Sequence, residues 1–122
     1  MLATFVFAPL LMAQAVTTDI VEQQVETRDV AYEEMVAGEF GAAIALLEDA
    51  LEDHPGDPAI LINLGSAHSA LGNWDTAQTY YRAARLSDEH YEMELADGRW
   101  LDSRDVAAMA MGAVEVRSLA SR

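Results

Sequence analysis

The chain of 122 residues contains neither cysteine nor lysine. Without a thiol, disulfide bridges, cysteine–metal centres and thiol catalysis are all excluded. Basic groups are also scarce, because seven arginines face 21 acids and the formal net charge is −14. So acidic a surface repels phosphate backbones, which argues against binding to nucleic acid or to anionic membrane surfaces. A basic partner fits this charge, and so does a solvated surface that serves only solubility.

A long hydrophobic run is missing as well. Residues 2–12 carry no charge, but they are too few to span a bilayer, which requires about 20 apolar residues. Ala13-Gln14-Ala15 follows and matches the small-x-small pattern of a cleavage site. We therefore predict that residues 1–15 are a secretory signal peptide and that the protein is periplasmic or secreted, without a stable membrane anchor. No basic residue precedes the run, so an uncleaved apolar arm is the alternative.

Groups that could support catalysis are few and scattered. His54, His68 and His90 show no i, i+4 spacing that would indicate a metal site. Ser66 and Ser69 have no histidine or aspartate arranged to activate them, and there is no glycine-rich phosphate loop. We therefore expect no catalytic residue, no metal, no cofactor and no enzymatic activity.

The stretch from Asp57 to Glu89 is the most strongly patterned part of the chain. Asp57-Pro58 is typical of a helix start, because aspartate caps free N–H groups and proline suits the first helical position. Gly72-Asn73 indicates the end of that helix. Apolar residues at helical spacing predict two antiparallel helices on either side of this turn: Ile60, Leu61, Leu64, Ala67 and Leu71, then Trp74, Ala77, Tyr80, Tyr81 and Ala84.

A second copy of this pattern lies 34 residues earlier. Residues of the same chemical type recur at five pairs of positions: Gly38 and Gly72, Phe40 and Trp74, Ala43 and Ala77, Leu47 and Tyr81, Ala50 and Ala84. Small residues at Gly65, Ala77 and Ala84 are placed where the paired helices must cross closely. A fixed period of this length predicts stacked helical hairpins.

These residues resemble the tetratricopeptide repeat (TPR) family, whose unit is a 34-residue helix–turn–helix. The resemblance implies two repeats, over about 24–57 and 58–91. The second copy departs from the family pattern at His68, where an aromatic residue is usual, and at Glu89, where proline is usual. The first copy is weak in its first helix, which we expect to run from near Asp19 to Ala37.

After the repeats the pattern changes. Residues 91–95 alternate apolar and acidic, as a strand does, and Asp97-Gly98 favours a two-residue hairpin turn. We predict a β-hairpin over 91–102 in which Leu95 pairs with Trp100, with Tyr91, Met93 and Leu95 on one face; an irregular loop is the alternative. A helix over 103–119 should then cap the array, with one apolar stripe: Val106, Met109, Ala110, Ala113, Val114 and Leu119. The predicted fold class is therefore all-α and TPR-like, with a small β-hairpin and a C-terminal capping helix, in a single domain over 16–122.

The resemblance places partner binding on the inner face of the first helix of each repeat. Apolar and hydrogen-bonding side chains are mixed there, as in a peptide groove: Arg28, Tyr32, Met35, Ile62, Asn63, Ser66 and Ser69, flanked by Val25 and Asp29. Asn63 matches one position of the carboxylate-clamp subtype, whose other positions are not met. The alternative is that Leu95 and Trp100 of the hairpin fill this face.

The function that the sequence predicts is an exported, non-catalytic interaction module, an adaptor or assembly factor that binds another protein or peptide. The alternative is a structural subunit that self-associates through the hairpin or through an open end of the repeats.

Overall fold

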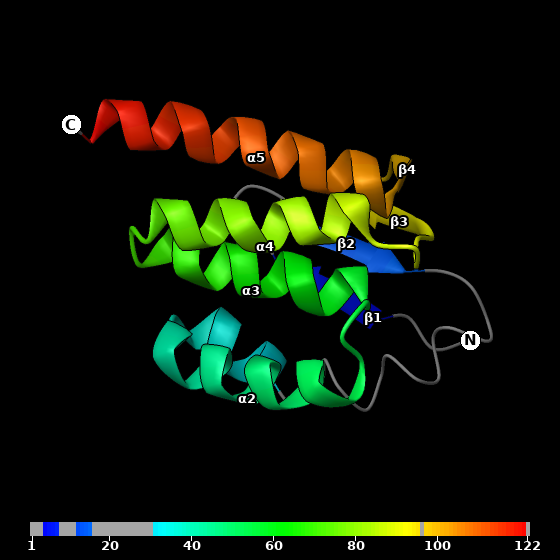
Figure 1. Cartoon of the computed structure of the whole chain (residues 1–122), viewed down its shortest axis with the longest axis horizontal. Helices are drawn as coiled ribbons and strands as arrows, with labels where there is room; N and C mark the ends of the chain where they lie inside the picture. The colour runs from blue at the N-terminus through cyan, green and yellow to red at the C-terminus, as the bar shows by residue number, and fades with distance from the viewer. Residues whose placement is uncertain (1–3, 8–11, 16–30, 96, 122) are drawn as a thin grey trace.

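The computed structural model describes residues 4–7, 12–15, 31–95 and 97–121, with side chains described from residue 31 onward. Figure 1 shows the long helices stacked side by side, with a small sheet behind them at one end. Residues 31–37 are helical, and the start of the predicted first helix lies outside the described residues. The other elements follow in chain order: β1 (Thr4–Phe7), β2 (Met12–Ala15), α2 (Phe40–Asp53), α3 (Pro58–Ala70), α4 (Trp74–Leu86), β3 (Glu92–Leu95), β4 (Trp100–Asp102) and α5 (Ser103–Ala120).

The helix α3 lies at the centre of the molecule. Its start is fixed as the sequence predicts, because Asp57 Oδ1 accepts a hydrogen bond from the N–H of Ala59 at 2.9 Å. Buried residues cover nearly its whole circumference. Ile60 and Leu64 pack into a hydrophobic cluster with 31–37 and α2, whereas Leu61 and Ile62 pack into a second cluster with α4, α5 and β3. The two halves of the core therefore meet in this helix.

The turns at Gly38 and Gly72 have the same geometry, one repeat length apart. Both glycines have positive φ, 76° and 77°. In each turn the glycine N–H donates back to residue i−3, at 3.2 and 3.0 Å, and the N–H of the next residue donates to residue i−5, at 2.8 and 2.9 Å. This is the Schellman pattern that ends a helix at a left-handed glycine. The predicted 34-residue period is thus present in backbone hydrogen bonds as well as in residue types.

The predicted close crossing of the second repeat is confirmed. A Cβ placed on Gly65 would lie 2.6 to 2.9 Å from ring atoms of Tyr81 on α4. Ala77 and Ala84 on the same helix have no exposed surface. The bulky ring therefore occupies the space that the glycine leaves empty.

The sheet is larger than the sequence indicated. Its four antiparallel strands have the order β1-β2-β3-β4, so the predicted hairpin forms only half of it. The other half comes from Thr4–Phe7 and Met12–Ala15, which belong to the region predicted to be an export signal, and β1 contacts α3. Cleavage after Ala15 stays a prediction, because pairing of these strands does not test it.

The register of the predicted hairpin is wrong by one residue. Trp100 faces Glu94, and Leu101 faces Met93. The loop between Leu95 and Arg99 is one residue longer than a two-residue turn, and Gly98 takes positive φ within it. A shift of one residue moves each side chain to the other face of a strand. Trp100 is consequently 43% exposed and does not pack beside Leu95, which is 4% exposed.

The capping helix α5 agrees with its predicted bounds to within one residue at its end. Its Asp102 cap accepts a hydrogen bond from the N–H of Arg104 at 2.9 Å. The inner stripe is buried as expected, at Val106, Ala110 and Val114. Met109 and Leu119 were predicted to belong to this stripe, but they lie on the exposed side. No helix within the described ranges is long and apolar enough to cross a bilayer.

The fold class is confirmed: the molecule is mostly helical, with TPR-like hairpins, a small antiparallel sheet and a C-terminal helix.

Candidate partner-binding surface

Most of the residues predicted to line the groove are buried. On α3, Ile62, Asn63, Ser66 and Ser69 are 0 to 3% exposed, and Met35 is 2% exposed. Tyr32 is the exception among the described members, with 37% of its surface exposed. Arg28, Val25 and Asp29 lie outside the described residues. A partner could touch the buried set only if the elements that cover it moved.

The two serines join helices instead of facing an open groove. Ser66 Oγ donates to the carbonyl of Ile62 at 2.9 Å and lies 3.0 Å from the Tyr81 hydroxyl on α4. Burial raises the pKa of Tyr81 to about 12, against the opposing effects of the Ser66 hydrogen bond and of Arg117. Ser69 Oγ accepts a hydrogen bond from Arg117 Nη1 of α5 at 3.2 Å. The serine hydroxyls therefore join α3 to α4 and to α5.

The sheet covers the predicted groove. β1 contacts α3, and β3 contacts α5. Leu95 of β3 is buried with Ile62 in one cluster, as the alternative of a groove filled by the hairpin expects. Trp100 takes no part in this filling, since the register turns it to the surface. The structure thus adds a contact to α3 that the sequence did not indicate, from β1 of the sheet.

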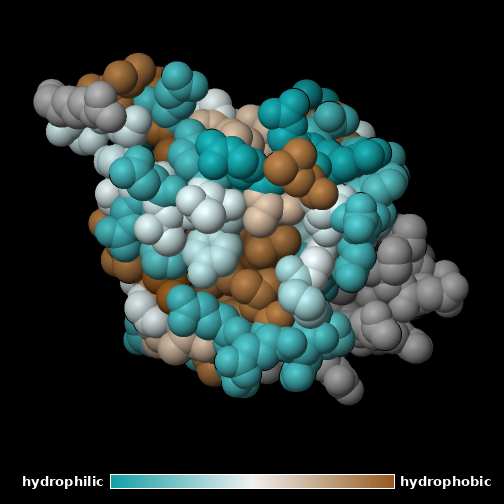
Figure 2. Space-filling view, viewed as in Figure 1, coloured by the Kyte–Doolittle hydropathy of each residue, from teal (hydrophilic) through white to brown (hydrophobic). Residues whose placement is uncertain are grey.

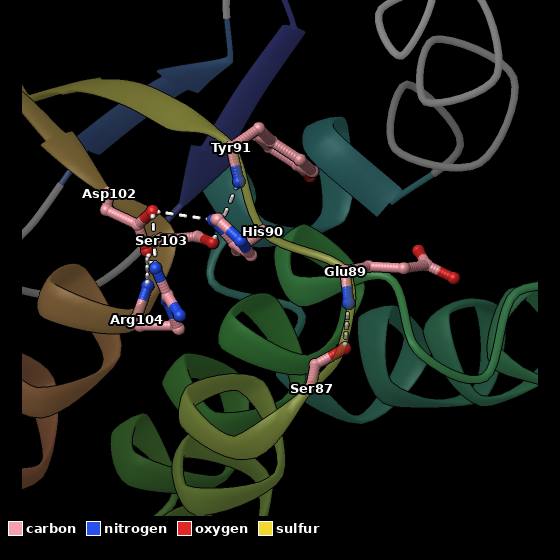
Figure 3. A network of polar contacts seen from close by, with 7 residues as sticks. All are labelled: Ser87, Glu89, His90, Tyr91, Asp102, Ser103 and Arg104. Atoms are coloured by element: carbon pink, nitrogen blue, oxygen red, sulfur yellow. Dashed lines mark hydrogen bonds and ion pairs between the residues drawn. The ribbon is translucent and has the colours of Figure 1, made fainter.

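A polar network ties the ends of β3, β4 and α5 together (Figure 3). His90 Nδ1 lies 2.8 Å from Asp102 Oδ2, and Arg104 donates to Asp102 Oδ1 through Nε at 3.0 Å. Burial by itself would raise the pKa of Asp102, but hydrogen bonds from the Arg104 side chain, the Arg104 N–H and His90 outweigh it and lower the pKa to about 2. Asp102 is therefore held ionised at the start of α5.

A second part of the network fixes the start of β3. The N–H of Tyr91 donates to Ser103 Oγ at 3.3 Å, and the N–H of Ser103 donates to the Tyr91 carbonyl at 2.9 Å. The Tyr91 hydroxyl donates to Asp57 Oδ1 at 2.9 Å, the same oxygen that caps α3. One carboxylate and one tyrosine thereby connect the second repeat to the hairpin.

The pairing of His90 with Asp102 resembles two of the three members of a hydrolytic triad. The adjoining Ser103 hydroxyl is engaged elsewhere, because its Oγ accepts a hydrogen bond from the N–H of Tyr91. Within the described part of the chain, no group of three or more His, Asp or Glu could hold a metal ion. The network is a structural clasp, and sequence reasoning missed it because its partners are joined by the hairpin's register.

Three large apolar side chains are exposed on the outer side of α5. Val116 is 68% exposed, Leu119 59% and Met109 40%. Figure 2 shows apolar surface at the C-terminal tip of this helix, which extends beyond α4 in Figure 1. A shallow cavity of about 450 Å³ lies between Trp74 on α4 and Val114 on α5. Beside this cavity, the guanidinium carbon of Arg117 lies 5.6 Å from the centroid of the Trp74 ring.

Comparison with known protein families finds one match, to the tetratricopeptide repeat model over residues 35–92. Residues 35–92 are a TPR region. The match begins inside the helical segment 31–37 and ends at the start of β3, so it includes α2, α3 and α4 together with both glycine turns. The curated proteins and the solved structures give no match to this chain.

TPR regions generally mediate binding between proteins, and the family is typically non-catalytic. In this chain the TPR region carries a sheet on its inner side and an apolar helix at its end.

Proposed function

We propose that the protein is an exported, non-catalytic adaptor or assembly factor that binds another protein. The TPR region over 35–92 carries this proposal, because it is a scaffold for recognition of proteins. Export is inferred from the sequence of residues 1–15 alone. The periplasm or the exterior of the cell is the location that such a signal implies.

Charge supports a basic partner. The helix α2 has four acids and no base: Glu48, Asp49, Glu52 and Asp53, all exposed. Two of them lie in its last turn, where the helix dipole is also negative. Positive residues on a partner would relieve this repulsion and speed association at low salt.

Crosslinking in the native cell, followed by mass spectrometry, tests the proposal. We expect a basic protein to be captured, and capture should decline as salt is raised. Replacing the four acids of α2 with their amides should weaken capture, whereas the matched change Glu115→Gln on α5 should not. Failure to capture any protein would overturn the adaptor role, and an intact mass that includes residues 1–15 would overturn cleavage.

A second candidate function is self-association through the outer face of α5. Met109, Val116 and Leu119 are exposed there, although a terminal cap of a repeat array normally has a polar outer face. The helix carries Arg104 and Arg117 against two acids, so its charges balance and two copies would repel each other only weakly at this surface. Size-exclusion chromatography with light scattering decides: a dimer abolished by Val116→Glu supports self-association, and a strict monomer excludes it.

A further inference from the structure

Two uncharged strands occupy the inner side of the TPR region. The segments Thr4–Phe7 and Met12–Ala15 contain no ionisable side chain, in a chain whose net charge is −14. β2 pairs along β3, and β1 contacts α3. The helix α3 supplies four of the predicted groove residues, and all four are buried.

We propose that β3 and the adjoining face of α3 form a binding site for an extended segment of a partner protein, and that the strands Thr4–Phe7 and Met12–Ala15 occupy this site in the uncleaved chain. The partner segment adds to β3 as an antiparallel strand in the place of β2. This inference rests on the proposed function, in which the exported form has lost residues 1–15. Strand addition of this kind obtains affinity from main-chain hydrogen bonds and specificity from alternate side chains.

The site remains fixed in position without β2. On its other side β3 is paired with β4, and the N–H of Leu95 donates to the Arg99 carbonyl at 2.7 Å. At its start, Tyr91 is bonded to Asp57 and to Ser103. Because these bonds involve no residue of β1 or β2, removal of β2 exposes a strand edge that is already extended.

The register defines the chemistry of the partner segment. Ala13 and Ala15 face Leu95 and Met93, whereas Gln14 faces Glu94. Met93 is fully buried and Leu95 is 4% exposed, so the residues opposite them must be small or apolar. Glu94 is only partly buried, and an arginine or lysine opposite it would replace a neutral pair with a pair of opposite charges. The site therefore takes an extended segment of the pattern small–basic–small.

The test uses the full chain with a site for a sequence-specific protease inserted after Ala15, cut after folding. The probe is a fluorescent peptide with the sequence of residues 4–15, in three versions with Gln, Arg or Glu at the position of Gln14. Fluorescence anisotropy measures binding to the cut chain. The uncut chain is the matched control, because its tethered segment competes at a high effective concentration.

We expect the cut chain to bind the peptides and the uncut chain to bind them much more weakly. The Arg version should bind about two- to fivefold more tightly than the Gln version, and the Glu version more weakly. Glu94→Arg should reverse this order. Amide exchange over 92–95 should accelerate on cutting and slow again when peptide is added.

Two binding results would overturn the inference: no binding of peptide to the cut chain, or equal binding to the cut and uncut chains. It would also be overturned if the cut chain lost helical circular dichroism when the fragment dissociated, or if it formed dimers by exchanging strands. The adaptor role is judged separately by capture from cells. A partner that binds cut and uncut chains equally leaves that role standing and removes the strand site; no partner for either chain removes the role itself.

Discussion

The absence of a side chain at Gly65 allows α3 and α4 to pack closely. The Tyr81 ring occupies the volume that a Cβ would need, and its hydroxyl reaches Ser66 one residue further along α3. A glycine in the middle of a helix costs conformational entropy, so its presence here has a packing reason. The α3–α4 pair could not approach this closely with any larger residue.

We predict that Gly65→Ala lowers the free energy of unfolding by about 1 to 3 kcal/mol, the usual cost of overpacking. Gly112→Ala is the matched control, since Gly112 is also within a helix but has no atom within 4 Å of the added Cβ. That change should raise stability by about 0.5 to 1 kcal/mol. Urea unfolding followed by circular dichroism measures both, and equal effects would contradict the close crossing.

A second prediction concerns Asp102, whose pKa is lowered from 3.8 to about 2. The unfolded carboxyl binds its proton first as pH falls, so the native state loses this stabilisation between about pH 4 and pH 2. The shift corresponds to about 2 kcal/mol at neutral pH. Asp102→Asn should therefore be less stable at pH 7, and its difference from the unchanged protein should shrink through that range.

Thermal unfolding at a series of pH values measures the difference. Glu115→Gln on the same helix serves as the control, because Glu115 is exposed and makes no ion pair among those of the described residues. A constant difference between pH 7 and pH 2 for Asp102→Asn would contradict the role of this carboxylate.

At the scale of elements, the hairpin β3–β4 depends on its loop. Gly98 at φ 84° permits a longer loop than the two-residue turn that Asp97-Gly98 favours by sequence. The register then moves by one residue, and Trp100 turns outward while Leu101 turns inward opposite Met93. The alternation in the sequence fixes which residues of one strand share a face. The length of the loop then decides which residues of the neighbouring strand lie beside them on that face.

The observed register predicts that truncation of Met93 destabilises the protein more than truncation of Trp100 does. Met93→Ala should cost about 2 to 5 kcal/mol, because the side chain is fully buried. Trp100→Ala should cost less than about 1 kcal/mol, since nearly half of this side chain is exposed. Denaturant midpoints measure both changes. A larger loss for Trp100 than for Met93 would indicate the register in which Trp100 packs beside Leu95.

At the scale of the whole molecule, repulsion between acids opposes compaction. The chain has 21 acids and seven bases, and only three ion pairs occur among the described residues, two of which involve Asp102. Most acids therefore have no close positive partner in the described part, and their repulsion acts over the distance that salt allows.

We predict that salt stabilises the protein. Raising ionic strength from about 0.01 M to about 1 M shortens the screening length from about 30 Å to about 3 Å, which should move the urea midpoint upward. The variant with four amides on α2 should gain less from salt, and Glu115→Gln should behave like the unchanged protein. A midpoint that falls with salt would contradict net repulsion as the dominant electrostatic effect.

The sequence by itself determined the TPR region. Its signals are local: a capping Asp57, glycines at 38 and 72, and a small residue opposite a large one at Gly65 and Tyr81. Each signal acts within one helical hairpin, so it can be recognised from residues that are close together in the sequence. The turn positions and the terminal helix could be predicted for this reason.

Only the tertiary structure decided what became of the predicted groove. Gln14 pairs with Glu94, and Asp102 pairs with His90, through strand registers that depend on loops and on packing against α3. Contacts between segments so far apart in the chain leave no periodic signal, because neither segment's pattern specifies its partner. The burial of Ile62 and Ser66 beneath or between other elements therefore follows from the assembled fold and from nothing that their own neighbours in the sequence display.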